Sequence, residues 1–442
     1  MSDVPAQYVV AGRSASEISG NVESAVRNGY LLPGSPLPTV RGLAQQLGVS
    51  PATVSAAYQS LRDRGVVTAD GRRGTRVAQR PPLPLARQLD PGGAIDLATG
   101  NPDPALLPDL TAALHAVRYS ARLYTNEHND AELLRLARHQ FSADGIPADH
   151  LTAVGGALDG VERALAAHTR PGDRVAVEDP GYAGVLELAR AMGLRLEPVA
   201  VDGSGMDPEA LAAALRRGAT AVVLTPRAQN PTGAALDSGR ITALRRVLRP
   251  HPHTLVVEDD HAGAVAGTPA LTVCTTRTPR WAVVRSVSKS LGPDLRLAML
   301  AGDEVTVGRV LGRMSVGTGW VSHVLQRLVV TLWRDRTVGR LLDRAAGTYA
   351  DRRSALLTAL DERGVSAEGR SGLNVWVPVP DETAVVQHMR AAGFAIAAGG
   401  RYRLAAPAGV RITTAALDVG AAPRVAAALA AALAPGGHAR TG

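Results

Sequence analysis

The feature that most constrains the fold is an alternation that begins at Ala94, where short apolar runs take turns with stretches of helical periodicity. Strands that alternate with helices are typical of an α/β unit with a mostly parallel sheet. We find no internal repeat. The clearest apolar runs are Leu151–Val154, Arg174–Val177, Thr220–Leu224, Leu255–Val257 and Ala282–Val284.

Polar residues stand directly after several of these runs, which is where open α/β sheets bind their ligands. Gly155 and Gly156 precede a helical stretch and offer free backbone N–H groups to a phosphate. Asn230 lies in an Asn-Pro-Thr-Gly sequence and could reach a ring hydroxyl. Asp259 could pair with a cationic ring nitrogen. Taken singly, each also fits a simpler role as a turn residue, a helix cap or a surface acid.

Two further side chains are equally ambiguous when each is taken alone. Tyr182 could stack on a ring, although a lone tyrosine is usually part of a core. Arg411 opens a β-like run. It could bind a carboxylate, or it could be a solvated strand residue.

Lys289 is the only lysine among the 48 lysine and arginine residues. Arginine can replace a surface lysine, but it stays protonated and cannot form a Schiff base. Chance survival would explain Lys289 if it stood alone. However, Ser286 and Ser288 precede it, and Arg296 follows after a Gly-Pro turn. This set suits an aldehyde cofactor that carries a phosphate, which indicates pyridoxal phosphate.

The first eighty residues are unusually basic. They hold nine arginines and five acidic residues, a net charge of +4 out of +8 for the whole chain. A basic segment of this kind favours a polyanionic partner. Apolar residues recur at helical spacing within 18–26, 40–47 and 54–61.

The last two of these stretches are joined by the tight turn Gly48-Val49-Ser50, in which Ser50 can cap the next helix. Two helices with a short glycine turn form a helix-turn-helix. Val66–Ala69 and Thr75–Val77 then predict a hairpin wing with Arg72 and Arg73 at its tip. A small helical bundle used for dimerisation is the alternative. The basic charge, the wing arginines, and Thr53 and Ser55 on the polar side of the third helix favour DNA.

The segment 79–93 is rich in proline and lacks periodicity, which is typical of a semi-rigid linker. We therefore expect three parts: a winged helix-turn-helix domain at 1–78, a linker at 79–93 and an α/β domain at 94–442.

The single cysteine, Cys274, excludes an internal disulfide and fits a reducing compartment. It has no neighbouring metal-ligand spacing, so we expect no metal site. The chain shows no run long and apolar enough for a membrane span and no signal-peptide pattern at its start. These observations predict a cytoplasmic protein.

The stretch LLPGSPLPTVRGLAQQLGVSPATVSAAYQSLRDRGVV closely resembles the DNA-binding domain of GntR-type transcription regulators. The resemblance spans roughly residues 8–78. It implies that double-stranded DNA is a partner and that Arg41 contacts its backbone or a base edge. It also implies that the third helix enters the major groove and that the wing contacts the minor groove.

From residue 95 to 434, the order Gly-Gly, Tyr, Asn-Pro-Thr-Gly, Asp, Ser-x-Ser-Lys, Arg, Arg resembles the fold-type I aminotransferases. The fused architecture is similar to the MocR subfamily of GntR regulators. The resemblance implies that Lys289 binds pyridoxal phosphate covalently and that Asp259 pairs with its pyridine nitrogen. Asn230 would bond the ring hydroxyl, and Tyr182 would stack on the ring.

The same resemblance assigns the phosphate to Ser286, Arg296 and the amides of Gly156 and Ala157, and an effector's α-carboxylate to Arg411. It also implies a homodimer, because Tyr124 resembles a tyrosine that reaches the partner subunit's phosphate. The match departs at His261, where the family usually has tyrosine. We expect histidine's charge to vary near neutral pH, which puts catalytic competence in question more than cofactor binding.

The sequence thus predicts a transcription regulator whose aminotransferase-like domain senses an amino acid, an amine or pyridoxal phosphate itself. One alternative is an active aminotransferase with an accessory DNA-binding domain. Another is a scaffold that has lost its cofactor and keeps the fold for dimerisation.

Overall fold

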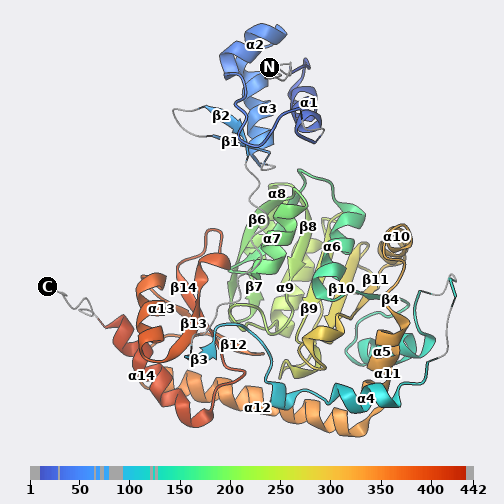
Figure 1. Ribbon diagram of the computed structural model, residues 1–442, viewed down its shortest axis with the longest axis vertical. Helices are drawn as coiled ribbons and strands as arrows, with labels where there is room; N and C mark the ends of the chain where they lie inside the picture. The colour runs from blue at the N-terminus through green and yellow to red at the C-terminus, as the bar shows by residue number, and fades with distance from the viewer. Residues whose placement is uncertain are drawn as a thin grey trace, which may run out of the picture. The chain divides into compact units, whose positions relative to one another are not determined.

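The structure is a computed structural model that describes residues 10–27, 30–63, 66–69, 74–78, 93–119, 123–124 and 128–434. The chain forms two compact units, which are described separately (Figure 1). The first lies at the N-terminus, and the second contains most of the chain from Leu89 onward.

The N-terminal unit is a three-helix fold with a short hairpin, as the sequence predicts. Helices α1 and α2 both pack on α3, and their apolar faces form a core around Ile18, Leu43, Val54 and Tyr58. The elements are α1 (Ala15–Arg27), α2 (Val40–Leu47), α3 (Pro51–Asp63), β1 (Val67–Ala69) and β2 (Thr75–Val77).

The turn between α2 and α3 follows from its residues. Helix α2 ends at Gly48, whose left-handed backbone (φ 67°) glycine adopts without steric cost. The Gly48 N–H donates to the Ala44 carbonyl, which satisfies one of the free carbonyls at the helix end. The Ser50 hydroxyl accepts the Thr53 N–H at 3.1 Å, so Ser50 caps α3 as expected.

The large unit is built on an eight-stranded sheet in the order β4-β11-β10-β9-β8-β5-β6-β7. Strands β5, β8, β9 and β10 pair in parallel, whereas β11 runs antiparallel between β10 and β4. The strands are β4 (His150–Val154), β5 (Arg174–Asp179), β6 (Arg195–Asp202), β7 (Gly205–Met206), β8 (Ala219–Leu224), β9 (Leu255–Asp260), β10 (Trp281–Ser286) and β11 (Ala298–Gly302).

Helices cover this sheet, and the apolar runs predicted from the sequence form its buried strands. Helix α6 packs on β9, β10 and β11, α8 packs on α9, and α5 packs on α11. The α-helices are α4 (Leu110–Ala116), α5 (Ala131–Ala143), α6 (Ala157–His168), α7 (Ala183–Ala191), α8 (Pro208–Arg216), α9 (Ser238–Leu248), α10 (Glu304–Ser315), α11 (His323–Arg334) and α12 (Arg336–Asp361). Short 3-10 turns are η2 (Pro104–Leu106), η3 (Gly263–Val265) and η4 (Pro293–Leu295).

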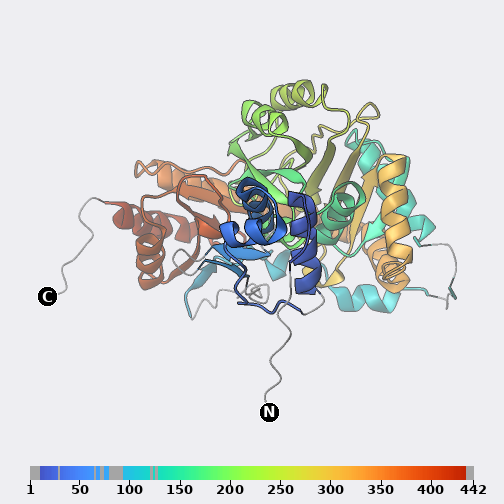
Figure 2. The same cartoon turned by 90° about the horizontal axis from the view of Figure 1, so that it is seen from above.

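A second, four-stranded sheet forms a lobe of its own in the large unit, with the order β12-β14-β13-β3. Figure 2 shows its red helices at one end of this unit and the gold helix α10 at the other. The sequence patterns do not reveal this lobe as separate. Its elements are β3 (Ile95–Leu97), β12 (Asn374–Pro378), α13 (Glu382–Ala391), β13 (Phe394–Ala398), η5 (Gly399–Arg401), β14 (Gly409–Thr413), η6 (Val419–Ala421) and α14 (Ala422–Leu433).

The long helix α12 links the two lobes, since it contacts both η3 and α14. Among the residues that the structure describes, no helix combines the length and apolar character that a membrane crossing requires.

Candidate cofactor site and DNA-binding surface

The predicted site residues gather at the carboxyl ends of the parallel strands. Asp259 lies in β9 and pairs in register with Val284 of β10, the strand that ends at Ser286 and leads to Lys289. Tyr182 follows β5, and Asn230 follows β8. Parallel strands bring these ends to one edge of the sheet, where ligands of α/β folds bind.

Asp259 is almost fully buried, with 2% of its surface exposed. Burial raises the pKa of its carboxyl to about 7, and the nearby Asp260 and Glu178 add to the rise. Its Oδ1 atom has no hydrogen-bond partner among the described residues. A buried carboxylate oxygen without a donor is costly. The protonated nitrogen of a pyridine ring would supply the missing donor, so this residue fits pyridoxal phosphate.

Lys289 lies in a half-buried position, and its Nζ donates to the Gly100 carbonyl at 2.8 Å. Burial lowers the pKa of this amine to about 8, and the charge of Arg411 lowers it further. A lysine with this pKa is partly neutral near neutral pH, which is the form that attacks an aldehyde. The same edge of the sheet therefore holds an amine of lowered pKa and a buried carboxyl whose Oδ1 has no partner among the described residues.

Gly156 and Arg296 form the predicted phosphate cradle. Gly156 has a positive φ of 106°, and a Cβ atom there would lie 3.3 Å from Nη2 of Arg296. Helix α6 begins at Ala157, so its first N–H groups have no partner within the helix. The Gly156 N–H, in contrast, already donates to the Val154 carbonyl at 2.9 Å. Ala157 and Arg296 are thus better placed for an anion than the Gly156 amide.

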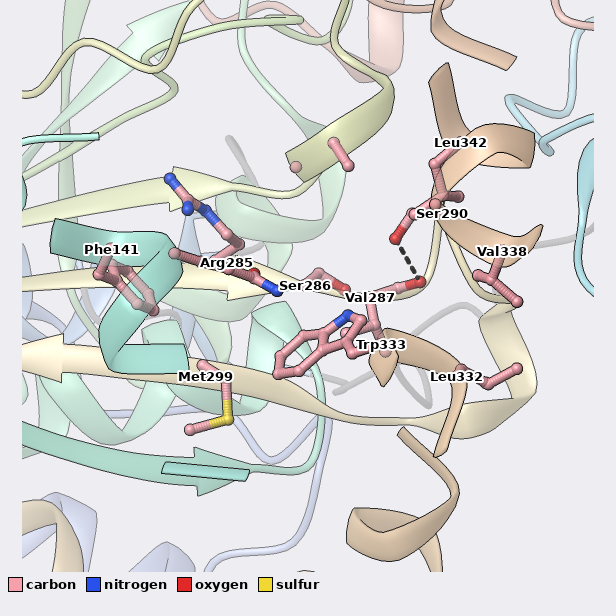
Figure 3. Close-up of a pocket in the computed structure, with 14 residues that line it drawn as sticks. Phe141, Arg285, Ser286, Val287, Ser290, Met299, Leu332, Trp333, Val338 and Leu342 are labelled. Carbon is pink, nitrogen blue, oxygen red and sulfur yellow. Dashed lines mark hydrogen bonds between the residues drawn. The ribbon is translucent and has the colours of Figure 1, made fainter. Parts of the chain in front are cut away.

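Ser286, which is predicted to bind the phosphate, is buried and hydrogen-bonded to Ser288. It ends strand β10 and lines a cavity of about 210 Å³ in the large unit (Figure 3). Its hydroxyl donates to Ser288 Oγ at 3.0 Å and accepts the Ser288 N–H at 3.1 Å. The two serines therefore fix the backbone just before Lys289. Ser286 would give a phosphate its hydroxyl hydrogen only by releasing Ser288 Oγ.

Arg411 lies in β14 and is 4% exposed. One terminal nitrogen, Nη2, donates to the Ala98 carbonyl, and the other, Nη1, donates to Asn230 Oδ1 at 3.0 Å. The guanidinium also lies 4.9 Å from the centre of the Tyr402 ring. Its Nε has no partner within the described part of the chain. Asn230 thus binds Arg411 through its oxygen in this structure.

Tyr182 packs its ring against Gly184, where a Cβ atom would approach the ring to 2.7 Å. Burial raises the pKa of its hydroxyl, and the carboxylate of Asp259 raises it further. Stacking of Tyr182 on the cofactor ring stays a prediction.

His261 follows β9 and is affected by the charge of Lys289. Burial lowers the pKa of its imidazole to about 4, and Lys289 contributes to the decrease. The side chain is therefore neutral at pH 7. The expectation that its charge varies near neutral pH is wrong, because burial and the charges of Lys289 and Arg227 outweigh the opposing effect of the Asp260 carboxylate.

Tyr124 is not brought to the other site residues of its own chain. Its side chain is 94% exposed. Its ring packs edge-to-face with the Trp320 ring, and the two ring centroids are 5.7 Å apart. A contact between Tyr124 and a partner subunit stays a prediction.

Sequence reasoning missed a buried charge cluster behind the site. Asp260 accepts Arg227 Nε at 2.8 Å and Arg285 Nε at 2.6 Å, and it is 1% exposed. These two guanidinium groups hold the pKa of Asp260 well below its usual range, despite its burial. The run Glu258-Asp259-Asp260 was the only signal, since three acids at the end of a buried strand must find partners.

The N-terminal unit exposes some of the side chains predicted to contact DNA. Arg41 near the start of α2 and Ser55 in α3 are exposed. Thr53 is half-buried, and its hydroxyl bonds Ser50 Oγ at 2.9 Å. Arg72 and Arg73, like residues 79–92 of the linker, lie outside the described residues.

Two family models match the chain. Residues 14–77 match the bacterial regulatory proteins of the gntR family, and residues 93–429 match aminotransferase class I and II.

Similar proteins combine the same two parts. The vitamin B6 salvage pathway transcriptional repressor PtsJ of Salmonella typhimurium is 39% identical over 93% of this chain and 96% of its own. The pyridoxine biosynthesis transcriptional regulator PdxR of Corynebacterium glutamicum is 30% identical over 55% of this chain and 56% of its own.

Among solved structures, the α-aminoadipate aminotransferase LysN of Thermus thermophilus matches with a TM-score of 0.67 and 22% identity, over 77% of this chain and 92% of that one. Its fold supports the aminotransferase architecture of the large unit. With both domains matched in order and PtsJ similar over nearly its whole length, the chain belongs to the MocR-type GntR transcription regulators, in which a GntR helix-turn-helix domain is joined to an aminotransferase-like domain.

Proposed function

We propose that this transcription regulator changes its DNA binding when pyridoxal phosphate occupies the site at Lys289. When bound, the cofactor supplies an aldehyde that condenses with amines and a ring nitrogen that carries a proton. Lys289 would hold it covalently, and Asp259 would accept a hydrogen bond from the protonated ring nitrogen. Arg296 and the Ala157 amide would bind its phosphate, and Tyr182 would cover the ring.

The observation that carries this proposal is a pair of hydrogen bonds to one backbone segment. Lys289 Nζ donates to the Gly100 carbonyl, and Arg411 Nη2 donates to the Ala98 carbonyl. Residues 98–100 follow shortly after the linker at 79–93. A ligand that takes Lys289 or Arg411 must release one of these carbonyls, so occupancy changes the contacts of residues 98–100, which follow strand β3 in the large unit.

The printed names of two similar proteins support pyridoxal phosphate as the effector. PtsJ is a repressor of a vitamin B6 salvage pathway, and PdxR regulates pyridoxine biosynthesis. A ligand can shift DNA binding only by its difference in affinity between two arrangements of the protein. Release of the 98–100 carbonyls is a contact change that could produce this difference.

An amino acid or amine that reacts with the bound cofactor is the second candidate. Arg411 favours it, because a ligand carboxylate could take the place of the Asn230 oxygen on its Nη1. Steady turnover of amino and keto acids would instead favour an aminotransferase, whereas a colourless protein that never binds the cofactor would favour a scaffold.

The test is a titration of the full-length protein with pyridoxal phosphate, followed both by visible absorbance and by affinity for the operator. We expect both signals to change at the same ligand concentration. Lys289→Ala should lose both changes and still fold, while Lys289→Arg serves as a control that keeps the charge. An absorbance change without any change in operator affinity would contradict the proposal.

The assembly that we propose is a cytoplasmic homodimer that binds two half-sites on double-stranded DNA. The exposed side chains Leu123, Tyr124 and Val316 support it, because each has at least four fifths of its surface exposed in the single chain. Sedimentation at micromolar concentration should give a dimer without DNA. A monomer under these conditions would contradict the assembly.

A further inference from the structure

The outer face of α3, the second helix of the helix-turn-helix, carries almost no charge. The other face of this helix is buried in the core of the N-terminal unit through Val54, Ala57, Tyr58 and Leu61. The exposed residues of the helix are Pro51, Ala52, Ser55, Ala56 and Gln59. Three of these five side chains consist of carbon and hydrogen alone, although the first eighty residues as a whole are basic.

The place of α3 in the unit gives this face a DNA partner. The second helix of a helix-turn-helix lies in the major groove, and residues near its N-terminus contact the edges of the bases. Residues 14–77 match the gntR family model, and the basic charge of the first eighty residues complements a polyanion. The first two turns of α3 are therefore the part of the helix that meets base edges (Figure 1).

The polar side chains of the first turn are already engaged within the protein. Ser50 Oγ accepts the Thr53 N–H at 3.1 Å and lies 2.9 Å from Thr53 Oγ1, so each hydroxyl has a partner. Further along, Gln59 Oε1 accepts Arg62 Nη2 at 2.8 Å. A glutamine reads adenine through both its oxygen and its nitrogen, so Gln59 would first have to release Arg62.

The residues of the outer face determine which base edges they can recognise. Arginine or lysine usually reads guanine, and the sequence of α3 has neither before Arg62. A carboxylate accepts the amino group of cytosine, and the helix has none before Asp63. Apolar side chains contact the C5 methyl group of thymine. Among the base-edge groups of the major groove, thymine methyls are thus the ones that match this face.

The spacing of the two exposed alanines suits neighbouring base pairs. Ala52 and Ala56 stand one helical turn apart on the same face, which is about 6 Å along the axis. Base pairs follow each other at about 3.4 Å. The two methyl groups therefore match thymines that are one or two base steps apart.

We propose that α3 recognises thymine methyl groups through Ala52 and Ala56, so that each half-site of the operator has T·A pairs at its centre. Ser55 lies on the same exposed face, and a serine hydroxyl can bond to more than one base. The inference rests on the proposed binding of two half-sites on double-stranded DNA, but not on the proposed effector.

The first step of the test is a selection of duplexes from a random library by the full-length protein, without and with pyridoxal phosphate. The enriched sequences should contain an inverted repeat whose half-sites share at least two T·A pairs. Half-sites that share no T·A pair would overturn the inference.

The second step replaces the thymines of the selected duplex with uracil, one position at a time. Uracil pairs with adenine as thymine does and lacks only the C5 methyl group. Two positions in each half-site should weaken binding, by about fourfold each, since each loses one buried methyl contact. A gel-shift titration measures this, and thymines outside the half-sites are the controls. Uracil without effect at every half-site position would overturn the inference.

A protein variant identifies the side chain that meets each methyl group. In Ala56→Gly, uracil at one of the two positions should no longer weaken binding. Gln46→Gly, at an exposed position of α2, is the matched glycine control and should keep both uracil effects. Both duplexes are compared on the same variant, so any loss of folded protein cancels. Uracil effects that are the same in both variants would exclude contact through Ala56.

A gain of specificity completes the test. Ser55→Arg places on this face a side chain that reads guanine, so a repeated selection should add a G·C pair at one position of each half-site. An unchanged selection would show that this face does not meet base edges. If pyridoxal phosphate leaves operator affinity unchanged while the uracil effects persist, the proposed effector is wrong and this inference stands.

Discussion

The two units place their functional side chains in opposite surroundings. In the N-terminal unit Arg41 and Ser55 lie exposed on short helices. The apolar core beneath them is formed by residues of this unit alone, between Val10 and Val77. In the large unit Asp259 and Arg411 are buried, and they come from segments about 150 residues apart. Exposed, solvated arginines can bind a DNA backbone, whereas a small molecule is bound in a site that buries most of its surface.

This difference has an energetic consequence. An exposed arginine costs little before DNA arrives, and its contribution to binding falls with salt because phosphate contacts release counterions. A buried carboxylate without a donor costs free energy in the cofactor-free protein. The large unit therefore holds a cost that its ligand relieves, and the N-terminal unit does not.

The largest expected effect is a complete loss of cofactor attachment in the large unit with no change in DNA binding by the N-terminal unit. Lys289→Ala should abolish covalent attachment of pyridoxal phosphate, because the chain has no other side-chain amine. Basal operator binding should be unchanged. Mass spectrometry after borohydride reduction measures covalent attachment of the cofactor, and a gel-shift titration measures operator binding. Pyridoxyl label on any other residue would show that the site is wrongly assigned.

The converse experiment changes a residue of the N-terminal unit and should affect DNA binding alone. Arg41→Ala should weaken operator binding by about 10- to 100-fold, as expected for loss of one arginine contact to a base edge or the backbone. Arg424→Ala in α14 is the control, since it removes the same charge from the large unit. Cofactor absorbance should stay unchanged in both variants. Equal loss of operator affinity in the two would mean that only net charge matters.

A pH experiment tests the cost of the buried carboxylate. The pKa of Asp259 is raised from 3.8 to about 7 in the folded protein, so its stabilising contribution is complete below pH 4 and is lost as the pH rises through 7. Asp259→Asn should therefore make the cofactor-free protein more stable than the unmodified one at pH 8, with little difference near pH 4. Thermal unfolding at both pH values measures this.

The adjacent residue gives the opposite sign. The pKa of Asp260 is held low by Arg227 and Arg285, so Asp260→Asn should destabilise the protein at pH 8. If Asp259→Asn and Asp260→Asn shift the unfolding temperature at pH 8 in the same direction, the opposite effects inferred for the two carboxylates are wrong.

A smaller effect should follow from the segment that contacts both Lys289 and Arg411. Gly100 has a φ of 73°, and a Cβ atom there would lie 3.3 Å from Arg411 Nη2. Gly100→Ala should move the segment at a cost of about 1 kcal/mol in stability and shift the concentration of pyridoxal phosphate that alters operator affinity. Gly145→Ala, also at positive φ but with open space, controls for backbone strain. Identical ligand responses would exclude a role for the 98–100 carbonyls.

The smallest expected effect concerns chemistry within the site. Because His261 is neutral at pH 7, its N–H is a much weaker acid than a tyrosine hydroxyl and should stabilise negative charge on the cofactor's ring oxygen less well. His261→Tyr should raise any residual transamination a few-fold without changing DNA binding. Stopped-flow absorbance with an amino acid and excess pyridoxal phosphate measures the rate. If the unmodified protein already transaminates amino acids at about 1–1000 per second, it is an active enzyme, and the proposed effect of His261 on catalysis is wrong.

How much the sequence predicts also differs between the units. The three helices and the hairpin follow from local periodicity and caps, so Ser50 and Gly48 fall where expected. In the large unit, Lys289 and Asp259 are recognisable because each follows a strand. The Asp260 cluster is not, because Arg227, Arg285 and Asp144 meet it only through the tertiary fold. The bond from Arg411 to Asn230 is a contact between the two lobes, and its bond to Ala98 joins residues 313 positions apart within the smaller lobe, so no local pattern encodes either.

Lys289 is the only lysine in the chain, and its lowered pKa makes the peptide that carries it a reporter of the site. An acylating reagent used near pH 8 would meet one side-chain amine, half of it already neutral. Its rate of labelling would measure how often the amine leaves the Gly100 carbonyl and reaches solvent. A ligand over the site would slow that rate, so occupancy could be followed by mass in an unmodified protein, without a dye or an engineered residue.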